Sequence, residues 1–130
     1  MLDTDICIHI VRGRPAKVKA RFGRLKPDEV VISVITYGEL CFGARKSNLS
    51  ADAFAQLKMF TEDVPVVPLD SLAGAQYGEI RAALEQQGHV IGNNDLWIAA
   101  HALALGLVLA TSNEREFGRI SGLRVENWAK

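Results

Sequence analysis

The chain has 130 residues, of which 48% are hydrophobic and 23% charged, and its 15 basic and 15 acidic side chains give a formal net charge of zero. This length and composition are typical of one folded domain rather than a disordered chain. The longest apolar runs fall short of the roughly 20 residues that span a bilayer, and the first residues lack the basic region of a signal peptide. We therefore expect one domain over residues 1–130, with no membrane partner and a cytoplasmic location.

Along the chain, short hydrophobic runs alternate with longer segments of helical periodicity. The short runs are rich in β-branched or aliphatic residues and predict buried strands at residues 30–33, 64–69 and 107–111. Apolar residues at helical spacing predict helices at residues 34–46, 52–61, 71–87 and 95–105. Ser50 is the predicted N-cap of the second helix, and Gly88 and Gly106 end the last two. Residues 1–2 are too short to predict a strand by themselves, and a first strand there is inferred only from the residues after them. The alternation predicts an α/β sandwich with a largely parallel sheet.

The basic residues are unevenly distributed. Seven of the fifteen lie in one acid-free segment, namely Arg12, Arg14, Lys17, Lys19, Arg21, Arg24 and Lys26. Such a run is commonly a solvated helix face. It also suits a surface that binds a phosphate backbone. Position in the sequence does not decide between the two interpretations.

Acidic residues occur near the expected strand ends and on one apolar helix face. Asp3 and Asp5 follow the inferred first strand, and Glu116 follows the strand at residues 107–111. Asp95 opens an apolar helix, and Glu39 shares a helical face with Ile35 and Phe42. Ligands of parallel sheets collect where the strands end, so we expect these carboxylates to converge.

Each acid also has a structural explanation. Asp3 or Asp5 could cap a helix, the helix dipole alone favours Asp95, and Glu116 could be a solvated turn residue. Glu39 is the exception, because its apolar neighbours predict a core-facing position where an unpaired carboxylate costs several kcal/mol. Converging carboxylates need a cation, and hard oxygen ligands without a Cys or His pair suit Mg²⁺ or Mn²⁺.

Four motifs together resemble those of a known family. They are residues 1–8 (MLDTDICI), 37–47 (YGELCFGARKS), 91–102 (IGNNDLWIAAHA) and 109–117 (LATSNEREF), with a last-strand pattern at 122–128. In this order they resemble PIN-domain nucleases, and more narrowly the VapC toxins of bacterial toxin–antitoxin pairs. The resemblance covers essentially the whole chain and implies a three-layer α/β/α sandwich with a mainly parallel central sheet.

The resemblance also implies a catalytic and metal-binding set. Asp3, Glu39 and Asp95 match the acidic positions of the family. Many relatives place the fourth acid where this chain has Asn113, and others place it just before the Phe, at Glu116. We favour Glu116, with Thr111 and Asn113 as polar supports. Asp5 stands where relatives commonly carry Asn, and its charge could tighten metal binding or cap the first helix.

By resemblance, the chain is expected to be a Mg²⁺- or Mn²⁺-dependent endoribonuclease that cleaves structured RNA, such as tRNA or initiator tRNA. A homodimer and a VapB-like antitoxin partner that forms a hetero-oligomer are implied as well. The basic residues Arg12, Arg14, Lys17, Lys19 and Arg21 are then candidates for contact with RNA. Two alternatives remain: an inactive PIN module that only binds a partner, and a haloacid dehalogenase-type phosphatase suggested by the DxD pattern at residues 3–5.

Overall fold

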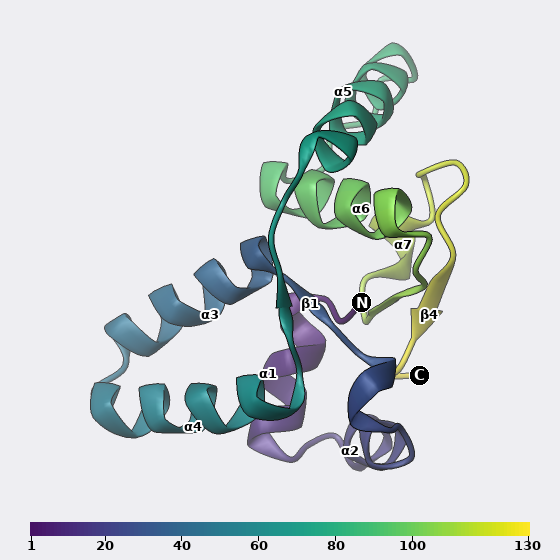
Figure 1. Cartoon of the computed structure of the whole chain (residues 1–130). Coiled ribbons are helices and arrows are strands. Elements are labelled where there is room, and N and C mark those ends of the chain that lie inside the picture. Colours follow the sequence, from purple (N-terminus) through teal and green to yellow (C-terminus); the bar gives the residue numbers. More distant parts are fainter.

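The computed structural model describes residues 1–130, with the side chain of Pro27 outside the description. Seven α-helices and four short strands follow one another among the described residues (Figure 1). The strands are β1 (Ile32–Ser33), β2 (Val66–Val67), β3 (Leu109–Thr111) and β4 (Val125–Asn127). The helices are α1 (Thr4–Arg12), α2 (Ala16–Gly23), α3 (Val34–Lys46), α4 (Ser50–Asp63), α5 (Ser71–Gln86), α6 (Asn93–Leu105) and α7 (Glu114–Phe117), with a 3-10 turn at Pro27–Glu29. No described helix is long and apolar enough to cross a membrane.

The first residues of the chain join two parallel strand pairs into one sheet. β1 pairs with β2, and β3 pairs with β4, both in parallel. Between them, Leu2 forms a parallel bridge with Ala110 and donates its backbone N–H to the Val31 carbonyl at 3.0 Å. Leu2 therefore lies between the two strand pairs, and the strand inferred at residues 1–2 is an isolated bridge in the structure. The last-strand pattern at residues 122–128 contains β4.

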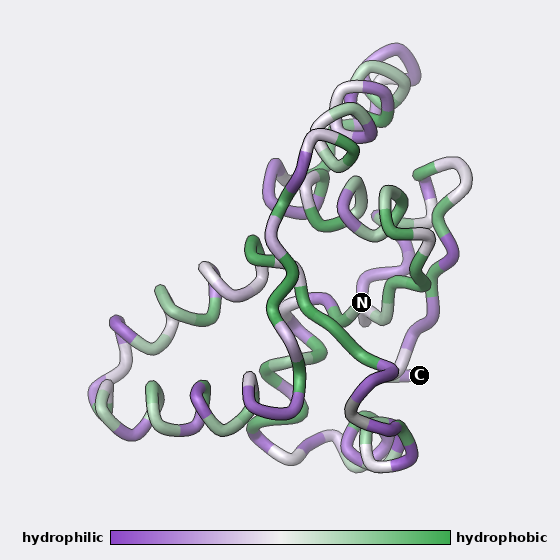
Figure 2. The backbone as a smooth tube through the Cα atoms, in the orientation of Figure 1, coloured by the Kyte–Doolittle hydropathy of each residue, from purple (hydrophilic) through white to green (hydrophobic). Residues whose placement is uncertain are grey.

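Hydrophobic side chains cover both faces of this sheet, which confirms the three-layer arrangement. Because neighbouring residues of a strand point to opposite faces, Met1 packs in one core and Leu2 in the other. The first core includes residues of α5 and α6, such as Leu84 and Ile98. The second includes residues of α1, α2 and α4. Figure 2 shows the chain through β1 as a mostly hydrophobic segment at the centre of the fold.

Helix ends follow from local capping, with one correction. α3 starts where predicted because the Ser33 hydroxyl accepts a hydrogen bond from the Ile35 N–H at 3.1 Å. α6 ends at Gly106, whose φ of 67° is easy only for glycine. The predicted N-cap at Ser50 is wrong, because Ser50 is the first residue of α4. The N-cap is Leu49, which makes no side-chain capping bond. The Ser47 hydroxyl accepts from the Leu49 N–H and so stabilises the turn before the helix.

Candidate active site

The four predicted acids lie around the edge where the strands end. Asp3 follows the bridge at Leu2 and is the N-cap of α1. Glu39 lies on α3, Asp95 lies in the first turn of α6, and Glu116 lies on α7, just after β3. Parallel strands end at a common edge, so the helices that come after them bring side chains to one place. Burial, followed by repulsion from neighbouring carboxylates, raises the pKa values of Asp3 and Asp95.

Asp3 is the most enclosed of the acids, with 6% of its surface exposed. Its Oδ1 accepts a hydrogen bond from the Thr4 N–H at 2.8 Å, and its Oδ2 accepts from the Thr111 hydroxyl at 2.7 Å. Burial, and then repulsion by Asp5, raise the pKa of Asp3 to about 7, although the two hydrogen bonds act in the opposite direction. Asp3 therefore both caps α1 and holds a charge at high energetic cost.

Asp95 is affected by the other carboxylates. Burial, followed by repulsion from Glu116 and Glu39, raises the pKa of Asp95 to about 6. A first-turn acid explained only by the helix dipole would have a lowered pKa. Burial and like-charge repulsion therefore outweigh the helix dipole at this position.

Glu39 lies in a different environment from the one predicted. Phe42 is 65% exposed and Glu39 is half-buried, so the expectation that this helix face points into the core is wrong. The face borders an open depression of about 700 Å³ instead. Glu39 Oε1 accepts from the Thr4 hydroxyl at 2.5 Å, and Oε2 accepts from the Asn94 side-chain amide at 3.5 Å. Polar neighbours on α1 and α6 thus orient this carboxylate toward the site.

Glu116 is tied to the loop before α6. Its Oε1 accepts from the Gly92 N–H at 3.2 Å, and its Oε2 accepts from the Asn113 side-chain amide at 2.9 Å. Asn113 in turn donates its backbone N–H to the Thr111 hydroxyl at 3.0 Å. Thr111 therefore contacts Asp3, and Asn113 contacts Glu116, which agrees with the suggested role of both as polar supports. On this side of the site, the carboxylate that acts on the pKa of Asp95 is Glu116.

Asp5 supplies an observation that favours a cation. Asp5 Oδ2 accepts from the Ser112 N–H at 3.3 Å and from the Ser112 hydroxyl, whereas its Oδ1 is buried with no hydrogen-bond partner. An unpaired buried carboxylate oxygen is costly unless a cation lies nearby. Asp5 does not cap α1, since Asp3 does.

The carboxylates fit a divalent cation in chemistry but do not converge on one point as they stand. No three His, Cys, Asp or Glu side chains of the described chain lie close enough to hold an ion. Glu39 is held by the Thr4 hydroxyl, and Glu116 is held by the Gly92 N–H. The oxygen-only donor set suits Mg²⁺ or Mn²⁺, with Asp3, Glu39, Asp95 and Glu116 as the candidate ligands.

The residues of the basic segment lie in three different environments. Arg12, in the last turn of α1, lines a groove of about 350 Å³ together with Glu39. Arg21 pairs with Glu126 of β4 at 2.9 Å and lies over the Trp128 ring at 5.5 Å. Arg21 therefore supports the edge of the sheet. Arg14, Lys17 and Lys19 are exposed, and their contact with RNA stays a prediction.

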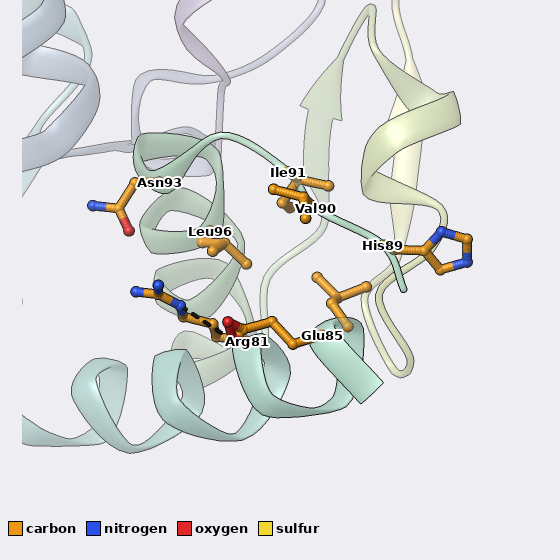
Figure 3. A pocket seen from close by; sticks show the side chains of 8 residues that line it. Arg81, Glu85, His89, Val90, Ile91, Asn93 and Leu96 are labelled. Carbon is orange, nitrogen blue, oxygen red and sulfur yellow. Dashed lines mark ion pairs between the residues drawn. The ribbon is translucent and has the colours of Figure 1, made fainter. Parts of the chain in front are cut away.

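A separate cavity of about 240 Å³ lies between α5, the following loop and the start of α6 (Figure 3). Leu84, Ile91 and Leu96 form its apolar part, and Arg81 and Glu85 form a long ion pair at 3.8 Å on α5. None of the four candidate ligands lines it. This cavity adjoins the first turn of α6 but is not the carboxylate site.

Sequence reasoning missed the polar residues that orient the acids. Thr4 contacts Glu39 and Thr36 through its hydroxyl, Ser112 contacts Asp5, and Asn94 contacts Glu39. Their one signal in the sequence is that Thr4 and Asn94 directly adjoin an acid of the site. Ser112 gave no such signal, because its partner is distant in the chain.

Known proteins resemble this chain in both sequence and structure. The PIN domain family matches residues 1–123. The tRNA(fMet)-specific endonuclease VapC of Shigella flexneri is 41% identical over 129 residues, which are 99% of this chain and 97% of that protein. Ribonuclease VapC1 of Haemophilus influenzae (strain R2866) is 42% identical, with 100% of this chain and 98% of that protein covered. A chain in the crystal structure of VapBC2 from Rickettsia felis, bound to a DNA fragment from its promoter, matches with a TM-score of 0.92 at 36% identity, covering 98% of this chain and 97% of that one.

Proposed function

This chain belongs to the PIN domain family, with its similarity to VapC ribonucleases extending over its full length, and we propose that it is the metal-dependent endoribonuclease toxin of a toxin–antitoxin pair. The observation that supports this most directly is the group of acids from α1, α3, α6 and α7 at one sheet edge, two of which have raised pKa values. A purely structural cluster of like charges would only destabilise the fold. Membership of the PIN family removes the haloacid dehalogenase alternative.

The chain's residues have distinct tasks in this proposal. A bound Mg²⁺ or Mn²⁺ supplies Lewis acidity for hydrolysis of a phosphodiester bond. Asp3 and Asp95 would hold the ion as carboxylates, and a nearby positive charge keeps both ionised at neutral pH. Thr111 fixes Asp3 and Thr4 fixes Glu39 through their hydroxyl groups. The N–H of Gly92 holds Glu116 beside α6.

The substrate we propose is RNA, with initiator tRNA as the first to be tested, because the Shigella flexneri relative is named for it. The exposed side chains of Arg14, Lys17 and Lys19 are suited to contact phosphates beyond the site. Arg12 is suited to contact a phosphate next to the carboxylates. Cleavage of tRNA would take place in the cytoplasm, where we place the protein.

We further propose an antitoxin as the partner, since similar chains occur in VapBC toxin–antitoxin structures. The groove between α1, α3 and α4 suits a peptide segment, because Ile8, Val11, Leu40 and Leu57 give it apolar walls, and Glu39 and Arg12 give it one negative and one positive group. A segment with apolar side chains and a charged partner for each of these groups would fill it and cover the site. A homodimer of the toxin within the complex is part of the same proposal.

The test is cleavage of purified initiator tRNA by the purified chain. We expect cleavage with Mg²⁺, none in EDTA, and a loss in Asp95→Asn that exceeds the roughly 10–100-fold effect of altering residues around a metal ligand. Asp63→Asn, an exposed acid on α4, is the matched control and should cleave normally. Cleavage in EDTA would contradict the metal mechanism. No cleavage of total RNA by a chain that still binds its antitoxin would show that this is an inactive PIN module.

A further inference from the structure

A buried histidine links the two helices that carry Glu39 and Asp95. His101 on α6 is 1% exposed, and its Nδ1 lies 2.8 Å from the hydroxyl of Ser33, which is fully buried at the start of α3. Ser33 precedes Glu39 by six residues, and His101 follows Asp95 by six residues. At 1.5 Å per residue, the contact lies about 9 Å along each helix from its acid. The pair is therefore beneath the site and outside it.

The surrounding hydrogen bonds determine how this contact is made. The Ser33 hydroxyl oxygen already accepts from the Ile35 N–H, so its one proton is free to be donated to His101 Nδ1. When Ser33 donates this proton, Nδ1 is the unprotonated nitrogen of a neutral ring. Burial lowers the pKa of His101, and the nearby Pro68 backbone carbonyl opposes that shift, as a carbonyl does when it faces a ring N–H. A neutral ring with its proton on Nε2 accepts from Ser33 at Nδ1 and leaves an N–H for the Pro68 carbonyl.

This contact holds together two helices whose acids repel each other. Two hydrogen bonds join α3 and its cap to α6 among the described residues: the contact of His101 with Ser33 at 2.8 Å, and that of Asn94 with Glu39 at 3.5 Å. The second is long and exposed, so it resists separation weakly. Asn94, the neighbour of Asp95, reaches Glu39 at 3.5 Å, so the like charges of Glu39 and Asp95 lie at this interface.

We propose that His101 is a positioning residue of the nuclease site: its hydrogen bond with Ser33 sets α3 against α6 and thereby sets the separation of Glu39 from Asp95. The inference rests on the proposed function, because that separation matters through metal binding. Residues that orient metal ligands from behind typically change metal affinity by 10–100-fold when replaced.

Two replacements of His101 separate this role from simple packing. The side-chain oxygen of Asn reaches the place of Nδ1, so His101→Asn keeps an acceptor for Ser33 and loses the Pro68 contact. The longer Gln side chain reaches the place of Nε2, so His101→Gln keeps the Pro68 contact and loses Ser33. Both variants remove the ring, and we expect similar losses of stability in urea.

Mg²⁺ binding measured by calorimetry should then differ between the variants. We expect His101→Gln to bind about tenfold more weakly and His101→Asn to stay within about threefold of the wild type. Ser33→Ala also removes the α3 cap, so it should weaken Mg²⁺ binding at least as much as His101→Gln, and the double variant should bind no more weakly than Ser33→Ala alone. Equal weakening of Mg²⁺ binding in His101→Asn and His101→Gln would show that His101 acts through packing alone. Unchanged Mg²⁺ binding in His101→Gln would overturn the proposal.

A second readout needs neither metal nor RNA. Residual dipolar couplings in EDTA report the orientation of α3 relative to α6, which should change in His101→Gln and stay as in the wild type in His101→Asn. If the wild type binds no Mg²⁺, the proposed function fails, and these couplings still decide whether His101 positions α3. Unchanged couplings in His101→Gln would refute the inference while leaving the nuclease proposal intact.

Discussion

Replacing Asp3 by Asn perturbs the candidate site without RNA or metal. The substitution keeps the shape of the side chain and removes its charge. Asn Oδ1 can still accept from the Thr4 N–H, and its amide can donate to the Thr111 hydroxyl where the carboxylate accepted. The difference is that a charge is no longer buried beside Asp5. We therefore expect Asp3→Asn to stabilise the metal-free protein at pH 8.

The magnitude and its sign follow from proton binding. The pKa of Asp3 is about 7 in the folded chain, against 3.8 for an ordinary aspartate. Between these values the folded state binds more protons than the unfolded state, so the free energy of unfolding falls as the pH rises from about 4 to 7 and stays low above 7. At 1.36 kcal/mol per pKa unit, the penalty at pH 8 is about 2–4 kcal/mol. Asp3→Asn removes it, and below about pH 4 the gain vanishes.

Urea unfolding followed by circular dichroism, in EDTA and at fixed protein concentration, measures this effect. With an m-value of about 1–3 kcal/mol/M, the midpoint of Asp3→Asn at pH 8 should rise by roughly 1–3 M. Mg²⁺ should stabilise the wild type at pH 8 and have little effect on Asp3→Asn. The exposed Asp63→Asn is the control and should leave the midpoint nearly unchanged. An equal or lower midpoint for Asp3→Asn at pH 8 would refute the account of Asp3 as a buried, repelled carboxylate.

Further expectations concern hydrogen bonding, RNA contact and packing. Thr111→Val removes the donor to Asp3, and should lower the free energy of unfolding by about 1–3 kcal/mol in urea and weaken Mg²⁺ binding in calorimetry. The double variant Lys17→Glu/Lys19→Glu should bind RNA more weakly and lower the slope of log K against log salt by roughly 1.5–2 in filter binding; an unchanged slope would exclude phosphate contact there. Ile98→Ala creates a cavity at a fully buried position and should cost about 2–5 kcal/mol by urea unfolding, with a cost below about 1 kcal/mol contradicting its place in the core.

Local sequence signals predicted the helices well. The helix at residues 34–46 was predicted with its observed bounds from its helical periodicity, and the structure adds the Ser33 cap. The helix ending before Gly106 was predicted from its glycine, which has the positive φ that the signal implies. Strand extents were less accurate. Residues 64–69 were predicted as a strand, and only Val66–Val67 pair, because pairing depends on a partner strand.

For the site, too, the sequence predicted some features correctly and others wrongly. Its acids could be found from their places after strands and at helix starts, together with the resemblance of the four motifs. Glu39 was identified for the wrong reason, since Phe42 beside it faces solvent. A helical face that looks core-facing in one sequence can border an open groove, because periodicity gives the direction of a face and not what covers it.

The sequence alone therefore determined the alternation of elements and the parallel sheet, and it supplied the candidate acids, since these depend on local periodicity, capping and motif order. Only the tertiary structure decided that Arg21 supports β4, that Asp5 has an unpaired buried oxygen, and that His101 contacts Ser33. These contacts join residues 68 to 107 positions apart, and Asp5 lies against Ser112 across the sheet edge. Burial and repulsion arise only when groups distant in the sequence come together. The raised pKa values of Asp3 and Asp95 therefore follow from the tertiary structure and not from the sequence.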